Sequence, residues 1–193
     1  MKSEREGLLL KRVLLDKKAM GRVMTRLGYQ LAENVDDLDH LALIGVRTRG
    51  VPLARRLQKI IKEAEGVEVP VGELDITLYR DDVFEGLSIP LVRPTFLPFE
   101  IAKRHVVLVD DVLFTGRTVR AALDAVMDWG RPRRIQLAVL IDRGHRELPI
   151  QPDFIGLEVE TTLDESVQVS IDESDGEDRV KLFTRGLSEV EAS

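Results

Sequence analysis

The stretch from Val106 to Thr118 restricts the possible fold more than any other part of this chain. It reads Val-Val-Leu-Val-Asp-Asp-Val-Leu-Phe-Thr-Gly-Arg-Thr, and so joins an aliphatic run, an acidic pair and a turn of small residues. A continuous β-branched and aliphatic run is typical of a strand that is covered on both faces in a parallel sheet. Asp110 and Asp111 should therefore emerge at the carboxyl end of that strand, where ligands bind in open α/β sheets.

The turn that follows, Thr115 to Thr118, is predicted to bind an anion. It precedes a helical pattern whose apolar positions are Val119, Ala122, Leu123, Val126 and Met127. Unpaired amides at a helix start, the helix dipole and the threonine hydroxyls all favour a phosphate. Because carboxylates repel a phosphate, the acidic pair must face sugar hydroxyls or a divalent cation, which suggests a sugar phosphate. A strand that ends in a solvated acidic turn is the simpler alternative.

A second strand, turn and helix repeats this organisation with the charge reversed. Residues 41–46 predict a strand, and Pro52 is predicted to open the next helix. Between them, Thr48, Arg49 and Gly50 offer backbone amides and a guanidinium that suit a diphosphate. Taken alone, an arginine beside a turn is more often solvated.

Further patterns predict elements on either side of these motifs. Asp16 is placed to cap a helix that runs to about Asn34. Residues 135–141 read as another buried strand, so the segment from Asp142 to Pro149 should reach the same sheet edge. Residues 166–184 predict an antiparallel hairpin around an Asp-Gly turn.

The least regular segment is predicted to be a flap. Residues 69–78 read as a strand, but residues of about 79–99 contain glycine and prolines without a sustained period. A flap would exclude water from an oxocarbenium-like transition state, although an ordinary surface hairpin fits the pattern equally. The apolar patch from Leu8 to Leu10 reads as an interface or as disordered.

Composition indicates a single globular domain without cysteine chemistry. The chain has 193 residues, 44% hydrophobic and 32% charged, and no apolar run of membrane-spanning length. The start of the chain does not resemble a signal peptide, so we expect a cytoplasmic protein that binds no membrane. The absence of cysteine excludes disulfides and thiolate metal sites. Any metal would be Mg²⁺ that arrives with a phosphate ligand, without direct protein ligation.

These motifs resemble those of the type I phosphoribosyltransferases, whose diphosphate-binding signature matches Val106 to Thr118. Together with the segments 74–82, 130–132 and 142–149, they are similar to the bacterial pyrimidine operon regulators that are also uracil phosphoribosyltransferases. The resemblance spans about residues 25–180. It implies an α/β fold: a twisted parallel sheet flanked by helices, with a small hood from the terminal segments and a flap hairpin. It also implies one domain over residues 1–193 and a homodimer or larger homo-oligomer.

The resemblance implies the reaction of uracil with phosphoribosyl diphosphate, aided by Mg²⁺, to give UMP and diphosphate. As catalytic residues it implies Asp110 and Asp111, which would hold the ribose hydroxyls, and Arg80, which would add charge to the diphosphate. It assigns Thr48 and Arg49 to the diphosphate and Arg143 to the base pocket. The other substrate-binding residues that it implies are Val106, Val107, Leu108, Val109, Val112, Leu113, Phe114, Thr115, Gly116, Arg117 and Thr118, of which the last six would hold the 5′-phosphate.

The resemblance further implies regulation, through uridine-nucleotide-dependent binding of pyrimidine operon leader mRNA and transcription attenuation. Its RNA-binding candidates in this chain are Thr25, Arg26 and Arg146. The chain departs from the regulators' pattern by replacing basic or histidine side chains at Tyr29, Asn34, Gln151 and Leu157.

Each lost cation removes a phosphate contact, and the net charge of −6 also disfavours nucleic acid, although Tyr29 offers stacking. Three alternatives therefore stay open. The protein is an enzyme that has lost RNA binding, a phosphoribosyltransferase for another base, or a non-catalytic RNA regulator that senses nucleotides.

Overall fold

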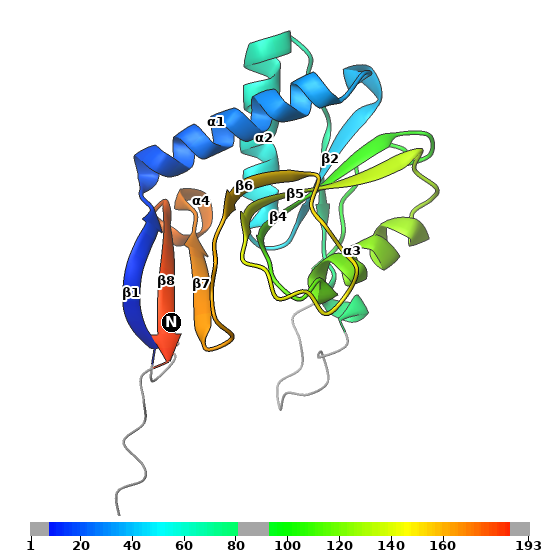
Figure 1. Ribbon diagram of the computed structural model, residues 1–193. Coiled ribbons are helices and arrows are strands. Elements are labelled where there is room, and N and C mark those ends of the chain that lie inside the picture. The colour runs from blue at the N-terminus through cyan, green and yellow to red at the C-terminus, as the bar shows by residue number, and fades with distance from the viewer. Residues whose placement is uncertain (1–7, 81–92, 186–193) are drawn as a thin grey trace, which may run out of the picture.

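A five-stranded parallel sheet forms the centre of the protein. The computed structural model describes residues 8–80 and 93–185. The strand order is β3-β2-β4-β5-β6, so β4 lies in the middle (Figure 1). The strands are β2 (Leu41–Val46), β3 (Val71–Leu74), β4 (His105–Leu113), β5 (Arg134–Asp142) and β6 (Phe154–Glu158).

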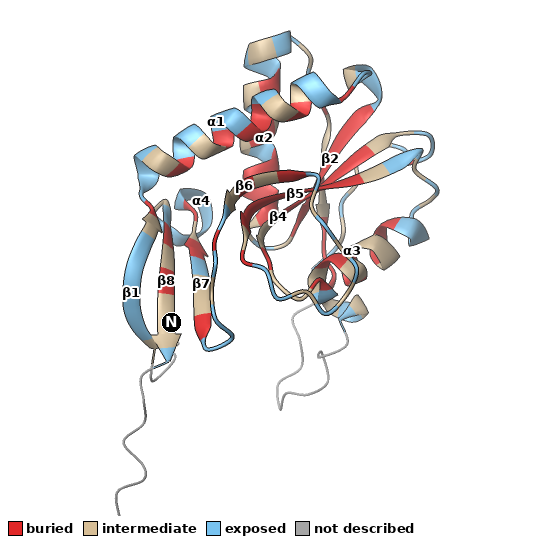
Figure 2. Ribbon diagram, in the orientation of Figure 1, coloured by how far each residue is buried: buried red, intermediate tan, exposed pale blue. Residues whose placement is uncertain are grey.

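Helices cover both faces of this sheet, as the resemblance implied. Helices α1 (Lys17–Asn34) and α2 (Gly50–Glu65) lie on one face, and α3 (Arg117–Asp128) lies on the other (Figure 1). Val107 and Val109 pack with α1 and α2, whereas Val106 and Leu108 pack with α3. Alternate residues of a strand point to opposite faces, which explains why the predicted strand is aliphatic at every position. Figure 2 shows these central strands as buried.

The predicted boundaries are confirmed for α1, whereas α2 begins at Gly50 rather than at Pro52. Asp16 caps α1 by accepting a hydrogen bond from the amide of Ala19 at 2.7 Å. In α3 the predicted apolar stripe is wrong at Met127, whose side chain is 56% exposed. The helix turns Ala121 and Ala125 toward the sheet instead, because small side chains allow a close approach. None of the helices in the described ranges is long and apolar enough to cross a membrane.

A second, antiparallel sheet forms the hood from both ends of the chain. Its order is β1-β8-β7, with β1 (Leu8–Leu15), β7 (Glu165–Ser170) and β8 (Arg179–Arg185). The antiparallel pairing of the last two strands confirms the sequence prediction. The simple Asp-Gly turn between them is wrong, because the short helix α4 (Asp172–Asp175) intervenes and ends at Gly176 with φ +76°.

One further prediction needs correction, one strand was not predicted, and the predicted flap lies largely outside the described residues. β3 ends at Leu74, and Thr77–Tyr79 forms a 3-10 turn rather than a continuation of the strand. The sequence did not predict β6. Residues 81–92 of the predicted flap are not described, but Phe96 pairs with Glu73 through two backbone hydrogen bonds of 2.8 and 2.9 Å.

Two glycines let the start of α2 lie directly against the sheet. A Cβ on Gly45 would be 2.4 Å from Cα of Val51, and a Cβ on Gly50 would be 2.2 Å from the carbonyl oxygen of Val109. Both distances are far shorter than van der Waals contact. The loop before α2 therefore takes its place beside the end of β4 only because these positions lack side chains.

We expect Gly50→Ala to lower the free energy of unfolding by about 1–3 kcal/mol, because the added methyl group must push α2 away from β4. Urea denaturation measures the change. Gly21→Ala is the control, since nothing lies within 4 Å of a Cβ at this exposed helical position. There the substitution should stabilise by about 1 kcal/mol. Equal stabilisation by both substitutions would contradict the close contact.

Candidate active site

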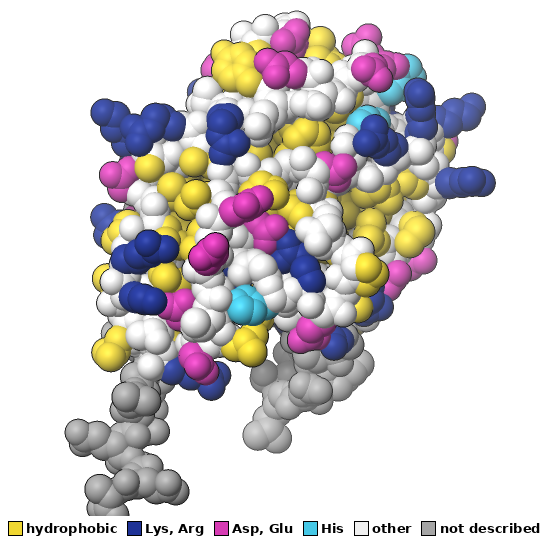
Figure 3. All heavy atoms as spheres, in the orientation of Figure 1, with side chains coloured by type: hydrophobic (Ala, Val, Ile, Leu, Met, Phe, Trp, Pro, Cys, Tyr) yellow, Lys and Arg dark blue, Asp and Glu magenta, His cyan; other side chains and the backbone are white. Residues whose placement is uncertain are grey.

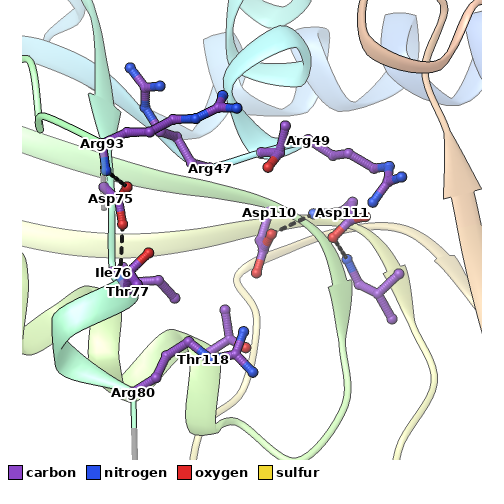
Figure 4. A pocket seen from close by; sticks show the side chains of 12 residues that line it. Arg47, Arg49, Asp75, Ile76, Thr77, Arg80, Arg93, Asp110, Asp111 and Thr118 are labelled. Atoms are coloured by element: carbon purple, nitrogen blue, oxygen red, sulfur yellow. Dashed lines mark hydrogen bonds between the residues drawn. The ribbon is translucent and has the colours of Figure 1, made fainter. Parts of the chain in front are cut away.

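A cavity of about 480 Å³ opens at the carboxyl edge of the parallel sheet. Its walls come from the ends of β2, β3 and β4 and from the start of α3 (Figure 4). Parallel strands end at a common edge, which is why residues distant in the sequence meet here. The lining residues are Arg47, Thr48, Arg49, Asp75, Ile76, Thr77, Arg80, Arg93, Asp110, Asp111, Val112 and Thr118.

The acidic pair lies inside β4 and faces this cavity. The Asp110 carboxylate is 6% exposed and accepts a hydrogen bond from the amide of Asp111 at 2.9 Å. Asp111 accepts one from the amide of Val112 at 2.9 Å. Burial, and then the charge of Asp111, raises the pKa of Asp110 well above its usual value. Burial also raises the pKa of Asp111, with Arg49 opposing the effect.

Cationic side chains outnumber carboxylates around the cavity. Four arginines and three aspartates line it, so the cavity suits a polyanion that also carries hydroxyl groups. Arg49 donates two hydrogen bonds of 3.0 Å to Asp175 of α4. Arg47 forms an ion pair with Glu73, and Arg80 lies where its charge favours the ionised form of Asp110. The peptide bond between Arg47 and Thr48 is cis.

Asp75 is a lining residue that the sequence analysis did not assign. It follows β3 and is 9% exposed. Its carboxylate accepts hydrogen bonds from the amides of Thr77 at 2.8 Å and Arg93 at 2.6 Å. Burial favours the protonated acid, but these hydrogen bonds and the charge of Arg47 hold the pKa of Asp75 below its usual value. The rule that located the other loops, side chains directly after a parallel strand, would have found it.

The predicted anion-binding turn forms a smaller hollow beside the main cavity. Residues 112–119 and Arg80 line this space of about 250 Å³. Gly116 adopts φ +93° and precedes the first turn of α3. The carbonyl oxygen of Thr115 accepts hydrogen bonds from the amides of Glu147 at 2.9 Å and Leu148 at 3.2 Å. The segment after β5 therefore supports the turn, and Arg80 connects the two hollows.

Other predicted substrate-binding residues lie away from these hollows. Val106 to Val109 are buried in the core, beneath the acidic pair. The Arg143 guanidinium lies 4.0 Å from the ring centre of Phe114 and donates to the hydroxyl of Thr161 at 3.2 Å and the carbonyl of Thr162 at 3.0 Å. Phe114 lines the smaller hollow, so Arg143 contacts a lining residue of this hollow without lining it itself.

The three RNA-binding candidates occupy two different places. Thr25 and Arg26 lie on the exposed face of α1, and Arg26 donates to the carbonyls of Ile155 at 3.3 Å and Gly156. Arg146 has only 14% of its side chain exposed and pairs with Asp142 at 2.5 Å. Its other donors bond carbonyl oxygens of the loops around the smaller hollow. In this structure Arg146 supports the loops rather than presenting a free cation.

The fold and the cavity together define a type I phosphoribosyltransferase. A parallel sheet carries, at one edge, an acidic pair, a glycine turn at the start of α3 and the arginine loop that follows β2, residues 47–49. These are the parts that a sugar with phosphates at two positions requires.

Comparison with known proteins gives the family. The phosphoribosyl transferase domain model matches residues 13–174. The chain is 55% identical over 172 residues to "Bifunctional protein PyrR" of Thermus thermophilus, covering 89% of this chain and 95% of the relative. It is 54% identical over 173 residues to the protein of that name from Deinococcus radiodurans, covering 90% and 94%. This chain therefore belongs to the phosphoribosyltransferase family and, within it, to the bifunctional PyrR proteins.

Solved structures support the fold. A hypoxanthine phosphoribosyltransferase from Staphylococcus aureus superposes with a TM-score of 0.67 at 18% identity, covering 92% of this chain and 94% of that one. At such low identity the likeness concerns the architecture alone.

Replacing Asp110 by asparagine should stabilise the protein and inactivate it. Because folding raises the pKa of Asp110, its contribution to stability is present below the unfolded pKa of about 4 and is lost as pH rises through the folded pKa. We expect Asp110→Asn to raise the unfolding free energy at pH 7 by roughly 1 kcal/mol and to slow turnover at least about 100-fold.

Urea denaturation between pH 5 and 8 and a diphosphate-release assay measure both effects. The control is Asp124→Asn, which removes an aspartate of α3 that pairs with Arg120 at 2.8 Å outside the cavity lining. It should leave the pH dependence and turnover unchanged. A fully active Asp110→Asn enzyme would refute the assignment.

Proposed function

We propose that this protein transfers the phosphoribosyl group of phosphoribosyl diphosphate to uracil, giving UMP and diphosphate. One observation supports the proposal: a single cavity brings the acidic pair of β4 together with the arginine loop of β2, next to the glycine turn at the start of α3. The choice of uracil rests on the membership among PyrR proteins. We also propose that residues 1–193 form one domain, which acts as a homodimer or larger homo-oligomer in the cytoplasm.

The proposed roles follow the chemistry of each side chain. Asp110 and Asp111 accept hydrogen bonds from the ribose 2′- and 3′-hydroxyls, and the turn from Leu113 to Thr118 donates amide hydrogen bonds to the 5′-phosphate. Thr48 and Arg49 hold the diphosphate, and Arg80 adds charge where the leaving group forms. The guanidinium groups of Arg49 and Arg80 stabilise the negative charge that develops on the diphosphate as the anomeric carbon becomes electron-poor.

The lining residues fit Mg²⁺ that is carried by the substrate. Within the described residues, histidine and carboxylate side chains form no group of three or more that could hold a metal alone. Diphosphate oxygens and water would therefore ligate the ion, and the carboxylate of Asp75 could accept hydrogen bonds from those water molecules. When bound, the ion neutralises charge on the diphosphate.

We place the base beside Phe114. Phe114 belongs to the turn whose amides are proposed for the 5′-phosphate, and its ring lines the smaller hollow. The guanidinium of Arg143 lies 4.0 Å from the ring centre. Arg143 is 7% exposed and tied to Thr161 and Thr162, so it can hold the ring in place. In this arrangement Arg143 shapes the base pocket while the ring contacts the base.

A panel of bases tests the substrate. We expect kcat/KM for uracil to exceed that for orotate, hypoxanthine and guanine by at least about 100-fold, because a pocket that pairs with polar base edges rejects mismatched bases strongly. Initial rates of diphosphate release, with Mg²⁺ present, measure the ratio. A preference for a purine would refute uracil and leave the transferase class intact.

We further propose that the protein regulates the pyrimidine operon by binding leader mRNA, and that the exposed face of α1 is the binding surface. Lys18, Arg22, Thr25 and Tyr29 lie on this face. Lys18 and Arg22 form no side-chain hydrogen bond or ion pair with any described residue, so their charges are available to phosphates. Figure 3 shows cations over this part of the molecule as separate groups rather than one continuous patch. Binding should therefore depend on few phosphate contacts.

Arg22→Ala should weaken binding of a pyrimidine leader RNA and reduce the slope of log K against log salt by about 1, because one phosphate contact is lost. Filter binding at several salt concentrations, with and without UMP, provides the data. Lys59→Ala is the matched control, since Lys59 is a cation on α2 with 80% of its side chain exposed. Absence of specific RNA binding by the wild-type protein would favour an enzyme that has lost this function.

A further inference from the structure

Ion pairs join α4 and the residues just after it to the start of α1 and to α2 with the loop before it. α4 belongs to the hood and lies between β7 and β8 (Figure 1). Lys17 pairs with Asp172 at 3.0 Å, Arg49 with Asp175 at 3.0 Å, and Arg56 with Glu173 and with Asp178 at 2.7 Å. Only the second of these pairs involves a residue of the cavity lining. Asp175 thus connects the hood to the proposed diphosphate loop.

The geometry of this pair leaves part of the guanidinium free for a ligand. Nε and Nη2 of Arg49 donate to the two carboxylate oxygens of Asp175, each at 3.0 Å. A guanidinium has five N–H groups, so this side-on pairing leaves Nη1 and one hydrogen of Nη2 for other acceptors. Figure 4 shows the Arg49 side chain extending beside Asp111 at the edge of the cavity. Arg49 can therefore bind Asp175 and a phosphate oxygen at the same time.

Asp175 is itself held rigidly. One of its carboxylate oxygens accepts a hydrogen bond from the amide of Ile171 at 2.9 Å, in addition to the bond from Arg49. The hydrogen bonds that Arg49 donates to Asp175 raise the pKa of Arg49 above its ordinary value against the effect of burial, and the charges of Asp175 and Asp111 add to this. Arg49 has 40% of its side chain exposed, so without a partner its four rotatable bonds would leave the guanidinium in many positions.

We propose that Asp175 is a positioning residue for the diphosphate of phosphoribosyl diphosphate: it holds the Arg49 guanidinium at the cavity edge from the hood. This inference rests on the proposed function, because Arg49 must bind the diphosphate. Asp175 does not touch the substrate. It restricts the Arg49 side chain before the substrate binds, so less conformational entropy is lost on binding and the substrate meets a preorganised cation.

Asp175→Asn tests the proposal, because asparagine replaces one of the two accepting oxygens by an NH₂ group, which cannot accept a hydrogen bond from Arg49. With Mg²⁺ present, we expect the Kd of phosphoribosyl diphosphate to rise roughly threefold to tenfold, the range for loss of a partly exposed bidentate pair. The Kd of ribose 5-phosphate, which lacks the diphosphate, should not change. In steady state, KM for phosphoribosyl diphosphate should rise while KM for uracil stays constant. Calorimetric titration measures both ligands.

Two further variants complete the design. Asp175→Glu keeps the carboxylate and should recover most of the affinity for phosphoribosyl diphosphate, whereas Asp175→Ser should behave like the asparagine variant. Glu173→Gln is the matched control: it removes a neighbouring α4 carboxylate that pairs with Arg56, outside the cavity lining. It should change neither Kd. Urea denaturation confirms that each variant is folded.

Several results would overturn the proposal. Equal weakening of both ligands would show a general structural role, and an unchanged Kd would show that Arg49 needs no partner. Tighter binding of phosphoribosyl diphosphate would show that Asp175 competes with the diphosphate for Arg49. Failure of the proposed function is a separate result. If the wild-type protein binds phosphoribosyl diphosphate but does not react with uracil, only the assignment of the base is wrong.

Discussion

The close packing of β4 against its two neighbours and two helix layers is the constraint on which the site depends. β4 pairs with β2 on one side and β5 on the other, and its side chains are buried on both faces as far as Asp110. The start of α2 reaches the end of this strand because Gly45 and Gly50 carry no side chains. An acidic strand end and an arginine loop are thereby brought to one cavity, and the rest of the sheet holds them there.

This arrangement buries two carboxylates side by side, which is unfavourable for folding. The carboxylate of Asp110 is buried beside Asp111, and burial and like charge both oppose its ionisation. Nearby guanidinium groups compensate only in part, since Arg80 and Arg49 lower the pKa of one aspartate each without reversing the direction of its shift. A ribose that donates hydrogen bonds would supply the missing compensation. The site is therefore less stable when empty than when occupied, as expected of a binding site.

Local patterns predicted the parts of the fold whose physics is local. The run from Val106 to Val109 had to be a buried strand, and Gly116 had to be a turn, because each choice follows from the residue types themselves. The sequence did not predict β1. Leu9 and Leu10 are 62% and 54% exposed, so the apolar residues of this strand do not alternate between core and solvent. The ion pair between Arg49 and Asp175 was not predicted for another reason. The two residues are 126 positions apart, and a local sequence pattern carries no information about such a contact.

The pairing of the cavity arginines also bears on turnover. Arg47 and Arg49 each face the cavity while a carboxylate, from Glu73 or Asp175, holds the guanidinium from outside. Without its partner, each guanidinium would lose conformational freedom whenever the diphosphate binds, so it would be a less ordered donor for the leaving group. In the roles proposed above, a paired arginine keeps its donors directed at the leaving group while its charge is partly balanced. The diphosphate would then meet an ordered set of hydrogen-bond donors as it leaves the anomeric carbon.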